Sequence, residues 1–302
     1  MKKIIGVIMG GVSSEREISF IEGREIIEKI DKDKYDVKEI IINSKKDVID
    51  KIKNIDFALL TLFGKFGEDG NVQAILESMN IPYSGSGMLT SALCMNKNLT
   101  KTVLERNFIN TAKWVEIKNI DEIDYNRLDK IGYPLIIKPN KGGSGISTLL
   151  IHNQSEVKKA IEDVLQIDEC AMVEKYIQGD EYTTFMLNKE VFPTISIKSN
   201  TEIFDYNSKY ISKDTEKTIC NITSQLEGKI NEVCKKCWDI FGCEVYVRID
   251  FIVNEDDIYI LELNTLPCTR QGGLVSQSIS EKGMSKAELI DKIIEYSLDV
   301  VR

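Results

Sequence analysis

Residues 244–267 read EVYVRIDFIVNEDDIYILELNTLP, a stretch in which apolar and polar positions alternate. The runs VYVRIDFIV and IYILELN are rich in β-branched and aromatic residues, which are typical of strands, and the polar residues NEDD separate them as a turn. The sequence therefore predicts an antiparallel β-hairpin, and the rest of the fold is expected to be organised around it.

The predicted hairpin carries oxygen-bearing side chains in a pattern that suits a metal ion. Asp250 lies near one end of the first strand, and Glu262 and Asn264 point to the same face of the second because they are two residues apart. Two carboxylates and an amide suit a hard cation such as Mg2+, with positions left for phosphate and water. Arg248 shares the side of Asp250 and can face an oxyanion. A single acidic residue would indicate only a salt-bridged strand face, but Arg-x-Asp followed by Glu-x-Asn favours a metal site.

Composition indicates a globular protein that acts on a small molecule. The 302 residues are 42% hydrophobic and 29% charged, which is enough for two or three sub-domains with their own cores. The net charge of −9 argues against nucleic acid as a partner. No apolar run approaches the roughly 20 residues of a membrane span and no signal peptide is recognisable, so a cytoplasmic location without membrane contact is expected.

The cysteines indicate reduced thiols. There are seven, an odd number without the spacing of a disulfide framework. Cys234 and Cys237 form a C-x-x-C pair in a helical pattern, but no second pair follows and His152 is the only histidine, so a structural zinc site lacks ligands. A helical cysteine pair without metal is the preferred interpretation.

The N-terminal region has the pattern of an open α/β unit. The strand KIIGVIMG runs through Gly10 into a helical segment in which Ser14 and Glu17 have capping-box spacing. Two further strands, YDVKEIIIN and IDFALLTLF, flank a short helix, and a glycine-rich loop and the helix NVQAILESMN follow. Ligands bind at the carboxyl ends of such strands. Glu15 therefore either stabilises the helix dipole or receives a substrate ammonium group.

A second region carries a nucleotide signal. YPLIIKPNKGGSGISTLLI predicts a strand that ends at Lys138, a glycine-rich loop and another strand, without the order of a Walker loop. One long helix, SALCMNKNLTKTVLERN, precedes it. After a helix near 155–165, CAMVEKYIQGDEYTTFML predicts a further strand pair joined at 175–180. Residues 174–177 would be a hinge that meets an adenine, and Glu181 would reach a ribose.

Nine blocks occur in an order that resembles the D-alanine–D-alanine ligases of the ATP-grasp superfamily: GGVSSEREIS, GEDGNVQAILE, PYSGSG, SALCMNK, IIKPN, EKYIQGDE, FDYNSKY, RIDF and LELNTLP. The resemblance implies an α/β ATP-grasp fold, in which an open α/β N-terminal domain (1–95) is followed by two α+β sub-domains (96–176 and 177–302) that clamp ATP. It also implies a homodimer that joins two D-alanines through an acyl phosphate for peptidoglycan synthesis.

The resemblance assigns roles position by position. Residues implied to contact ATP are Lys97, Lys138, Glu174, Lys175, Ile177, Glu181 and Lys209. Residues implied to hold two Mg2+ ions, with Mn2+ as an alternative, are Asp250, Glu262 and Asn264. Residues implied to be catalytic are Glu15, Ser144, Tyr210 and Arg248. Glu15 would also bind the ammonium group of the first substrate, and Arg248 would stabilise the oxyanion.

The chain departs from the family pattern where the second substrate binds. Phe63 replaces a usual histidine, and in NTLPCTRQGGLV (264–275) Cys268 replaces a glycine and Gly273 a serine next to Leu274. Two alternatives stay open: D-alanine is still accepted through backbone N–H groups and Lys209, or another amine such as D-serine is preferred, with Arg270 binding its carboxylate.

Two other function classes remain as competitors. A Rossmann-type oxidoreductase would need a G-x-G-x-x-G fingerprint after the first strand, which the sequence lacks. A nucleotide sensor without turnover has no need of the complete metal and oxyanion set. The sequence therefore favours the ligase.

Overall fold

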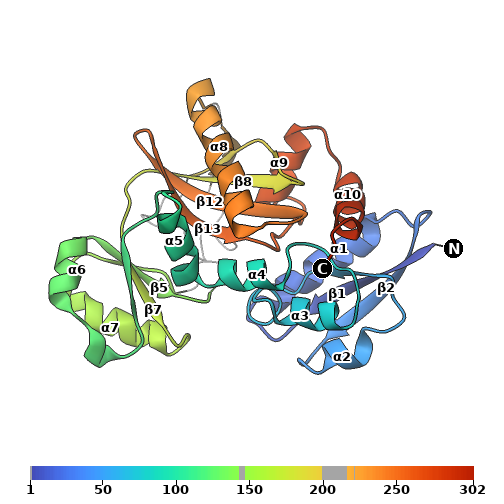
Figure 1. The fold of residues 1–302 in the computed structure, drawn as a ribbon, viewed down its shortest axis with the longest axis horizontal. Coiled ribbons are helices and arrows are strands. Elements are labelled where there is room, and N and C mark those ends of the chain that lie inside the picture. Colours follow the sequence, from blue (N-terminus) through green and yellow to red (C-terminus); the bar gives the residue numbers. More distant parts are fainter. Residues whose placement is uncertain (1, 143–146, 199–215, 221) are drawn as a thin grey trace.

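The computed structural model describes residues 2–142, 147–198, 216–220 and 222–302. The chain forms three units, each built on its own sheet: a three-stranded, a four-stranded and a six-stranded one. Figure 1 shows the three-stranded unit in blue on the right, the four-stranded unit in green on the left and the six-stranded unit between and above them.

The first unit is a parallel α/β sheet with the strand order β2-β1-β3. Its strands are β1 (Lys3–Gly10), β2 (Tyr35–Ile42) and β3 (Phe57–Leu60), and its helices are α1 (Arg16–Lys29), α2 (Asp47–Lys51) and α3 (Asn71–Ser78). The run IIGVIMG is buried because it forms the central strand and has a neighbour on both sides. The predicted β-α-β repeat is confirmed.

The predicted capping box at the start of α1 is wrong. The helix begins at Arg16 with Glu15 as its N-cap, and no side-chain hydrogen bond caps it in the described part of the chain. Ser13, not Ser14, is the serine that organises this turn. Its hydroxyl donates to the Phe63 carbonyl at 2.6 Å and accepts from the Glu15 N–H at 3.1 Å, because the loop after β3 lies against the loop after β1.

The four-stranded unit is an antiparallel sheet with the order β4-β7-β5-β6. Its elements are β4 (Trp114–Ile117), η1 (Ile120–Glu122), α6 (Tyr125–Ile131), β5 (Leu135–Pro139), β6 (Leu149–Ile151), α7 (Gln154–Leu165) and β7 (Ala171–Lys175). Val157, Ile161 and Val164 of α7 are buried at helical spacing and pack on the sheet. The two predicted strands that flank the glycine-rich loop are confirmed as the antiparallel pair β5 and β6.

The six-stranded unit is antiparallel, with the order β11-β10-β8-β12-β13 and β9 paired to β8. Its elements are β8 (Asp180–Leu187), β9 (Glu190–Val191), β10 (Ile195–Lys198), β11 (Glu216–Ile219), α8 (Ser224–Phe241), β12 (Tyr246–Asn254) and β13 (Asp257–Asn264). The predicted hairpin is confirmed. Its register places Asp250 opposite Glu262 and Arg248 opposite Asn264.

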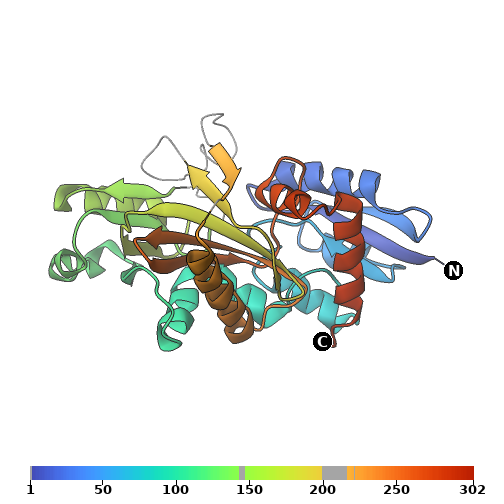
Figure 2. The same ribbon diagram turned by 90° about the horizontal axis from the view of Figure 1, so that it is seen from above.

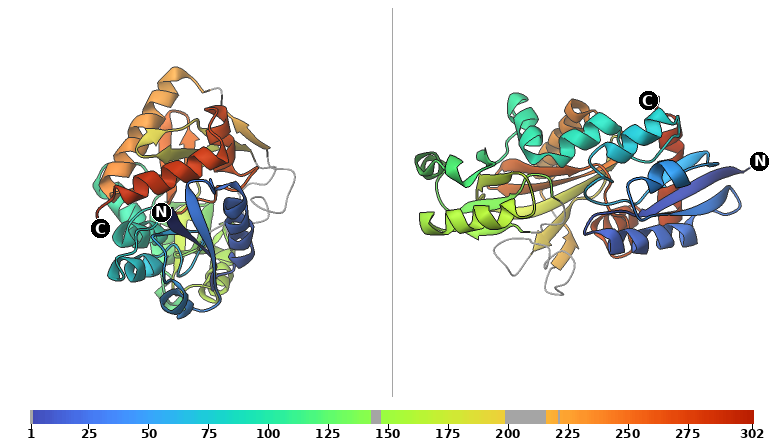
Figure 3. Two further views of the ribbon diagram at one scale, coloured as in Figure 1. Left: turned by 90° about the vertical axis from the view of Figure 1, so that its right-hand side faces the viewer. Right: turned by 90° about the horizontal axis from the view of Figure 1, so that it is seen from below.

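Two local predictions are wrong for reasons of long-range pairing and capping. β7 and β8 do not pair with each other: β4 and β5 already occupy both edges of β7, so the chain crosses at 176–179 into the next sheet. The helix expected over 91–107 is two helices, α4 (Met88–Met95) and α5 (Lys97–Arg106). Asn96 separates them, since it is extended and its side chain accepts from the Leu99 N–H. Figure 3 shows α3, α4 and α5 following one another along one side of the molecule.

The C-terminal helices α9 (Leu274–Glu281) and α10 (Lys286–Leu298) return to the first unit. Ile290 and Ile294 of α10 share a buried cluster with Val7 and Met9 of β1. Figure 2 shows α10 alongside the N-terminal unit. The loop between β13 and α9 is therefore held between two units of the molecule.

Cys234 and Cys237 are buried free thiols of α8, in the core between this helix and the six-stranded sheet. Within the part of the chain that the structure describes, no helix is long and apolar enough to cross a membrane.

Candidate active site

The loops that follow β1 and β3 meet at Glu15. This carboxylate is buried, and a Cβ at Gly64 would lie 2.6 Å from its Oε2 atom. Gly64 also has a φ of +71°, which favours glycine. A side chain at position 64 would therefore push Glu15 away, and the glycine lets the carboxylate sit at the carboxyl end of the parallel sheet, as predicted.

Glu68 is a site residue that the sequence analysis missed. It accepts a hydrogen bond from the Gly64 N–H. Burial, together with the nearby negative charge of Glu15, raises its pKa to about 8, so the folded protein favours the neutral form of this carboxyl. Its position in the predicted ligand-facing loop was the available signal, but nothing in GEDG distinguishes it from an ordinary turn residue.

The hairpin brings the predicted metal residues together. Asp250 is buried and accepts from Arg248 Nε at 2.9 Å and from Arg248 Nη2 at 2.8 Å. Thr183 donates to Asp250 at 2.6 Å, and Asn264 Nδ2 lies 3.2 Å from the same carboxylate. Arg248 and Asp250 thus lie on one side of β12, as the two-residue period predicts.

Lys97 connects this hairpin to the glycine-rich loop. Its Nζ atom lies 3.3 Å from Glu262 Oε2 and donates to the Gly142 carbonyl, and its backbone N–H donates to Asn140 at 3.2 Å. Lys97 is buried as the first residue of α5. The break at Asn96 is what turns a lysine of an apparently exposed helix toward the site.

Lys138 and Glu174 form a buried ion pair, and Lys101 completes it. Lys101 Nζ lies 2.8 Å from Glu174 Oε2, and Lys138 contacts the other oxygen. Burial opposes ionisation of Glu174, but the two lysines outweigh it and hold its pKa at about 2. Burial lowers the pKa of Lys101, which is fully inaccessible. Lys101 was missed because its role depends on a partner 73 positions away in the sequence.

The remaining predicted ATP residues lie near the crossing between the two antiparallel sheets. The Lys175 side chain donates to the carbonyls of Gly132 and Tyr133 at 3.1 and 3.0 Å. Ile177 is partly buried in the connection, and Glu181 lies on β8 opposite Ile252 of β12. The three positions thus lie at the end of β7, in the connection and on β8, while their contact with ATP stays a prediction. Three predicted residues, Ser144, Lys209 and Tyr210, lie outside the described residues.

The positions expected for the second substrate surround one loop. Gly273 is the N-cap of α9, its N–H donates to the Arg270 carbonyl at 3.0 Å, and Leu274 is the first helical residue. Phe63 is buried, and it lines one small cavity together with Pro267 and Thr269. The departures from the family pattern at 63 and at 268–273 therefore lie next to each other in the fold.

The donor set of the hairpin fits a hard divalent cation. Among the described residues no group of three His, Cys, Asp or Glu side chains forms a metal cluster. The predicted set instead combines two carboxylates that are register partners, Asp250 and Glu262, with the amide of Asn264. Oxygen donors of this kind suit Mg2+ bound together with phosphate.

Comparison with known proteins identifies the relatives of this chain. The family model described as "D-ala D-ala ligase C-terminus" matches residues 99–295. A D-alanine–D-alanine ligase from Clostridium botulinum (strain Loch Maree) is 46% identical over 298 residues, which covers 99% of each chain.

Solved structures give the same result for the fold. The D-alanine–D-alanine ligase from Bacillus anthracis complexed with ATP has a TM-score of 0.90 and 40% identity, and the match covers 98% of this chain and 97% of that one. The VanG D-Ala:D-Ser ligase from Enterococcus faecalis has a TM-score of 0.85 and 26% identity, and the match covers 98% of this chain and all of that one. The three sheets and the hairpin therefore belong to an arrangement found in both proteins.

Proposed function

We propose, because this chain belongs to the D-alanine–D-alanine ligase family, that it uses ATP to join two D-alanine molecules. The family resemblance carried by the nine sequence blocks and the ATP-grasp fold are confirmed. The dipeptide would supply peptidoglycan synthesis. The observation in the structure that best supports the proposal is Lys97, which joins the acidic hairpin to the glycine-rich loop.

The first step would transfer the γ-phosphoryl group of ATP to the carboxylate of the first D-alanine. Such a transfer needs positive charge around the phosphoryl oxygens more than it needs an acid or base. Lys97 and Lys138 supply two cations beside the glycine-rich loop, and Lys209 is proposed as a third. Glu174, Lys175, Ile177 and Glu181 are proposed to receive the adenine and ribose.

Asp250, Glu262 and Asn264 are the residues that would hold two Mg2+ ions, or Mn2+ in their place. Bound there, the ions neutralise phosphate charge during the transfer. Arg248 now pairs with Asp250, and we propose that it also stabilises the oxyanion of the tetrahedral intermediate. Thr183 donates to Asp250 and so helps to fix this carboxylate.

In the second step the amine of the second D-alanine would attack the acyl carbon and release phosphate. Glu15 is proposed to bind the ammonium group of the first substrate, which its burial at the end of the parallel sheet supports. Ser144 and Tyr210 are proposed to join Glu15 in closing the site against water, which would otherwise hydrolyse the acyl phosphate.

The second substrate is proposed to place its carboxylate at the N-terminus of α9, next to Arg270. A helix N-terminus offers backbone N–H groups to an anion, and Gly273 has no side chain that would compete for them. D-alanine is the favoured acceptor, because relatives named D-alanine–D-alanine ligase reach 46% identity, whereas the one named D-Ala:D-Ser ligase has 26%. D-serine is the alternative.

Domain boundaries near 95 and 176, a homodimer and a cytoplasmic location complete the proposal. The boundaries are supported by the sheets, since β3 ends at Leu60, β4 begins at Trp114 and β8 begins at Asp180. The dimer and the location are proposals that rest on the sequence alone.

Phosphate release with ATP, Mg2+ and D-alanine tests the proposed function. We expect release that depends on D-alanine, and a loss of at least 100-fold in the variant Glu262→Gln, because removing a metal-held phosphoryl clamp costs several kcal/mol. Asp257→Asn, at the exposed start of the same strand, is the control and should retain wild-type turnover. Absence of D-alanine-dependent release by the wild type would reject the proposal, and full activity of Glu262→Gln would reject the metal assignment.

A further inference from the structure

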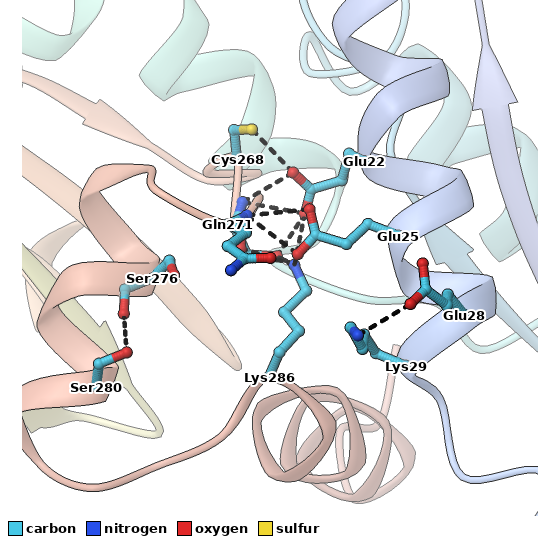
Figure 4. Close-up of polar contacts among 10 residues, drawn as sticks. Glu22, Glu25, Glu28, Lys29, Cys268, Gln271, Ser276, Ser280 and Lys286 are labelled. Carbon is cyan, nitrogen blue, oxygen red and sulfur yellow. Dashed lines mark hydrogen bonds and ion pairs between the residues drawn. The ribbon is translucent and has the colours of Figure 1, made fainter.

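A buried carboxylate on α1 binds the loop that carries the acceptor positions. Glu22 is 2% exposed, yet it lies on the helix of the first unit and contacts residues almost 250 positions later. Both of its oxygens accept from the Thr269 N–H at 3.0 Å, and the Thr269 hydroxyl also donates to it. Figure 4 shows the Glu22 carboxylate pointing from α1 toward this loop.

Lys286, the first residue of α10, contacts both Glu22 and Thr269. Its Nζ atom lies 3.2 Å from Glu22 Oε1 and donates to the Thr269 carbonyl at 2.7 Å. The backbone N–H of Thr269 is therefore held by α1 and its carbonyl by α10. Fixed charges on two helices thus determine where residue 269 lies.

A second carboxylate holds the loop on the other side of Arg270. The Gln271 N–H donates to both oxygens of Glu25 at 3.0 Å, and Glu25 lies 3.9 Å from Lys286. Residues 269 and 271 are both fixed, so the backbone at Arg270 between them is fixed as well. The Arg270 carbonyl in turn accepts from Gly273 at the start of α9.

Cys268 adds a contact that the glycine usual in the family cannot make. Its Sγ atom donates to Glu22 Oε2 at 2.8 Å. Burial and the Glu22 carboxylate raise the pKa of this thiol, so it stays a protonated donor. Cys268, one of the positions where this chain departs from the family pattern, thus adds a hydrogen bond between the loop and Glu22.

We propose that Glu22, Glu25 and Lys286 are positioning residues for the acceptor subsite, which fix Arg270 and the N-terminus of α9 where the carboxylate of the second amino acid binds. The inference rests on the proposed function. It assigns these three residues to recognition of the second substrate, since their side chains contact residues 268, 269 and 271 of the loop.

The proposal predicts a selective defect. Removing the Glu22 charge leaves Lys286 and Thr269 without their buried partner, so the loop samples other positions and the acceptor binds more weakly. Activation of the first D-alanine uses Glu15, the hairpin and Lys97, which keep their own contacts. A general loss of structure would instead reduce both half-reactions together.

Hydroxylamine separates the two half-reactions. It attacks the acyl phosphate, releases phosphate and leaves D-alanine hydroxamate, so its product reports activation without an occupied acceptor subsite. With ATP, Mg2+ and fixed hydroxylamine, the D-alanine concentration that diverts half of the product from hydroxamate to dipeptide measures acceptor binding. We expect Glu22→Gln to raise this concentration at least tenfold while hydroxamate formation at low D-alanine stays within threefold of wild type.

The control is Glu28→Gln, on the same helix, whose carboxylate contacts the neighbouring Lys29 at 3.0 Å on the surface (Figure 4). This variant should leave the half-diversion concentration within twofold of wild type. If Glu22→Gln does not fold, Glu25→Gln is tested in its place. This variant should raise the half-diversion concentration by about threefold to fivefold, because it weakens only the contact with the Gln271 N–H and the 3.9 Å contact with Lys286.

Two results overturn the inference: an unchanged half-diversion concentration in the folded variants, or equal losses in hydroxamate and dipeptide. Failure of the proposed function looks different, because then the wild type itself forms no D-alanine hydroxamate.

Discussion

Replacing Glu174 by glutamine is expected to destabilise the protein by about 3 kcal/mol at neutral pH. The carboxylate, on β7, lies buried between Lys101 of α5 and Lys138 of β5. Glutamine has the same shape but no charge, so the substitution leaves two buried ammonium groups with no opposite charge. Breaking a buried ion pair in this way typically costs 3–5 kcal/mol.

The pKa of Glu174 gives an independent magnitude. It is about 2 in the folded protein against a usual value of 4.5, which corresponds to about 3 kcal/mol. The folded pKa is depressed, so this stability is present above pH 4.5 and is lost as the pH falls toward 2. Lys101 limits the cost, because burial lowers its pKa and it can release its proton in the variant.

Urea unfolding at pH 7 measures the effect. Glu169→Gln is the matched control, since its side chain is 85% exposed and lies 3.9 Å from Lys141; it should change the unfolding free energy by less than about 0.5 kcal/mol. The difference between wild type and Glu174→Gln should shrink between pH 4.5 and pH 3, as far as the folded state persists. A difference below about 1 kcal/mol at pH 7 would refute the view that this pair is strongly coupled.

Two further predictions concern the site. Glu68→Gln should remove a pH dependence of stability, because the folded pKa of Glu68 is raised to about 8 and wild-type stability should therefore fall as the pH rises from about 4.5 to 8. The melting temperature of the variant relative to that of the wild type should rise over this range, and a constant difference between the two melting temperatures would contradict the assignment. Gly273→Ser should improve acceptor binding about tenfold in the hydroxylamine diversion assay, because a hydroxyl bonded to a charged group contributes about 1.5–3 kcal/mol and the φ of −79° suits serine. The new Cβ would lie 3.0 Å from the Arg270 carbonyl, so a weaker acceptor would mean that the loop cannot yield.

Sequence periodicity predicted the elements whose partners are near in the chain. The hairpin of β12 and β13 and the unit β1-α1-β2 follow from alternation and helical spacing, which are local properties. The two-residue period also predicted that Glu262 and Asn264 share one face of their strand. The pairing of Asp250 with Glu262 was not predictable, because the short turn alone would place Asp250 opposite Leu261 and a register shift between Asp250 and Phe251 moves it to Glu262.

Long-range contacts account for what the sequence did not predict. β7 and β8 fall in different sheets because β4 and β5 compete for the edges of β7. Glu22 has the pattern of an ordinary helix position, and only the return of the chain at Thr269 makes it a buried hydrogen-bond partner of the loop between β13 and α9. The same holds for Lys101, whose neighbours along α5 give no indication of Glu174.

The most direct test of the proposed ligase reaction follows an oxygen atom. D-alanine labelled with 18O in its carboxylate is incubated with the protein, ATP and Mg2+, and the released phosphate and the dipeptide are analysed by mass spectrometry. In the acyl-phosphate route the carboxylate oxygen bonds to the γ-phosphorus and leaves with it when the amine attacks the carbon. The account predicts D-alanyl-D-alanine and one 18O in each released phosphate, whereas unlabelled phosphate, or phosphate without dipeptide, would contradict it.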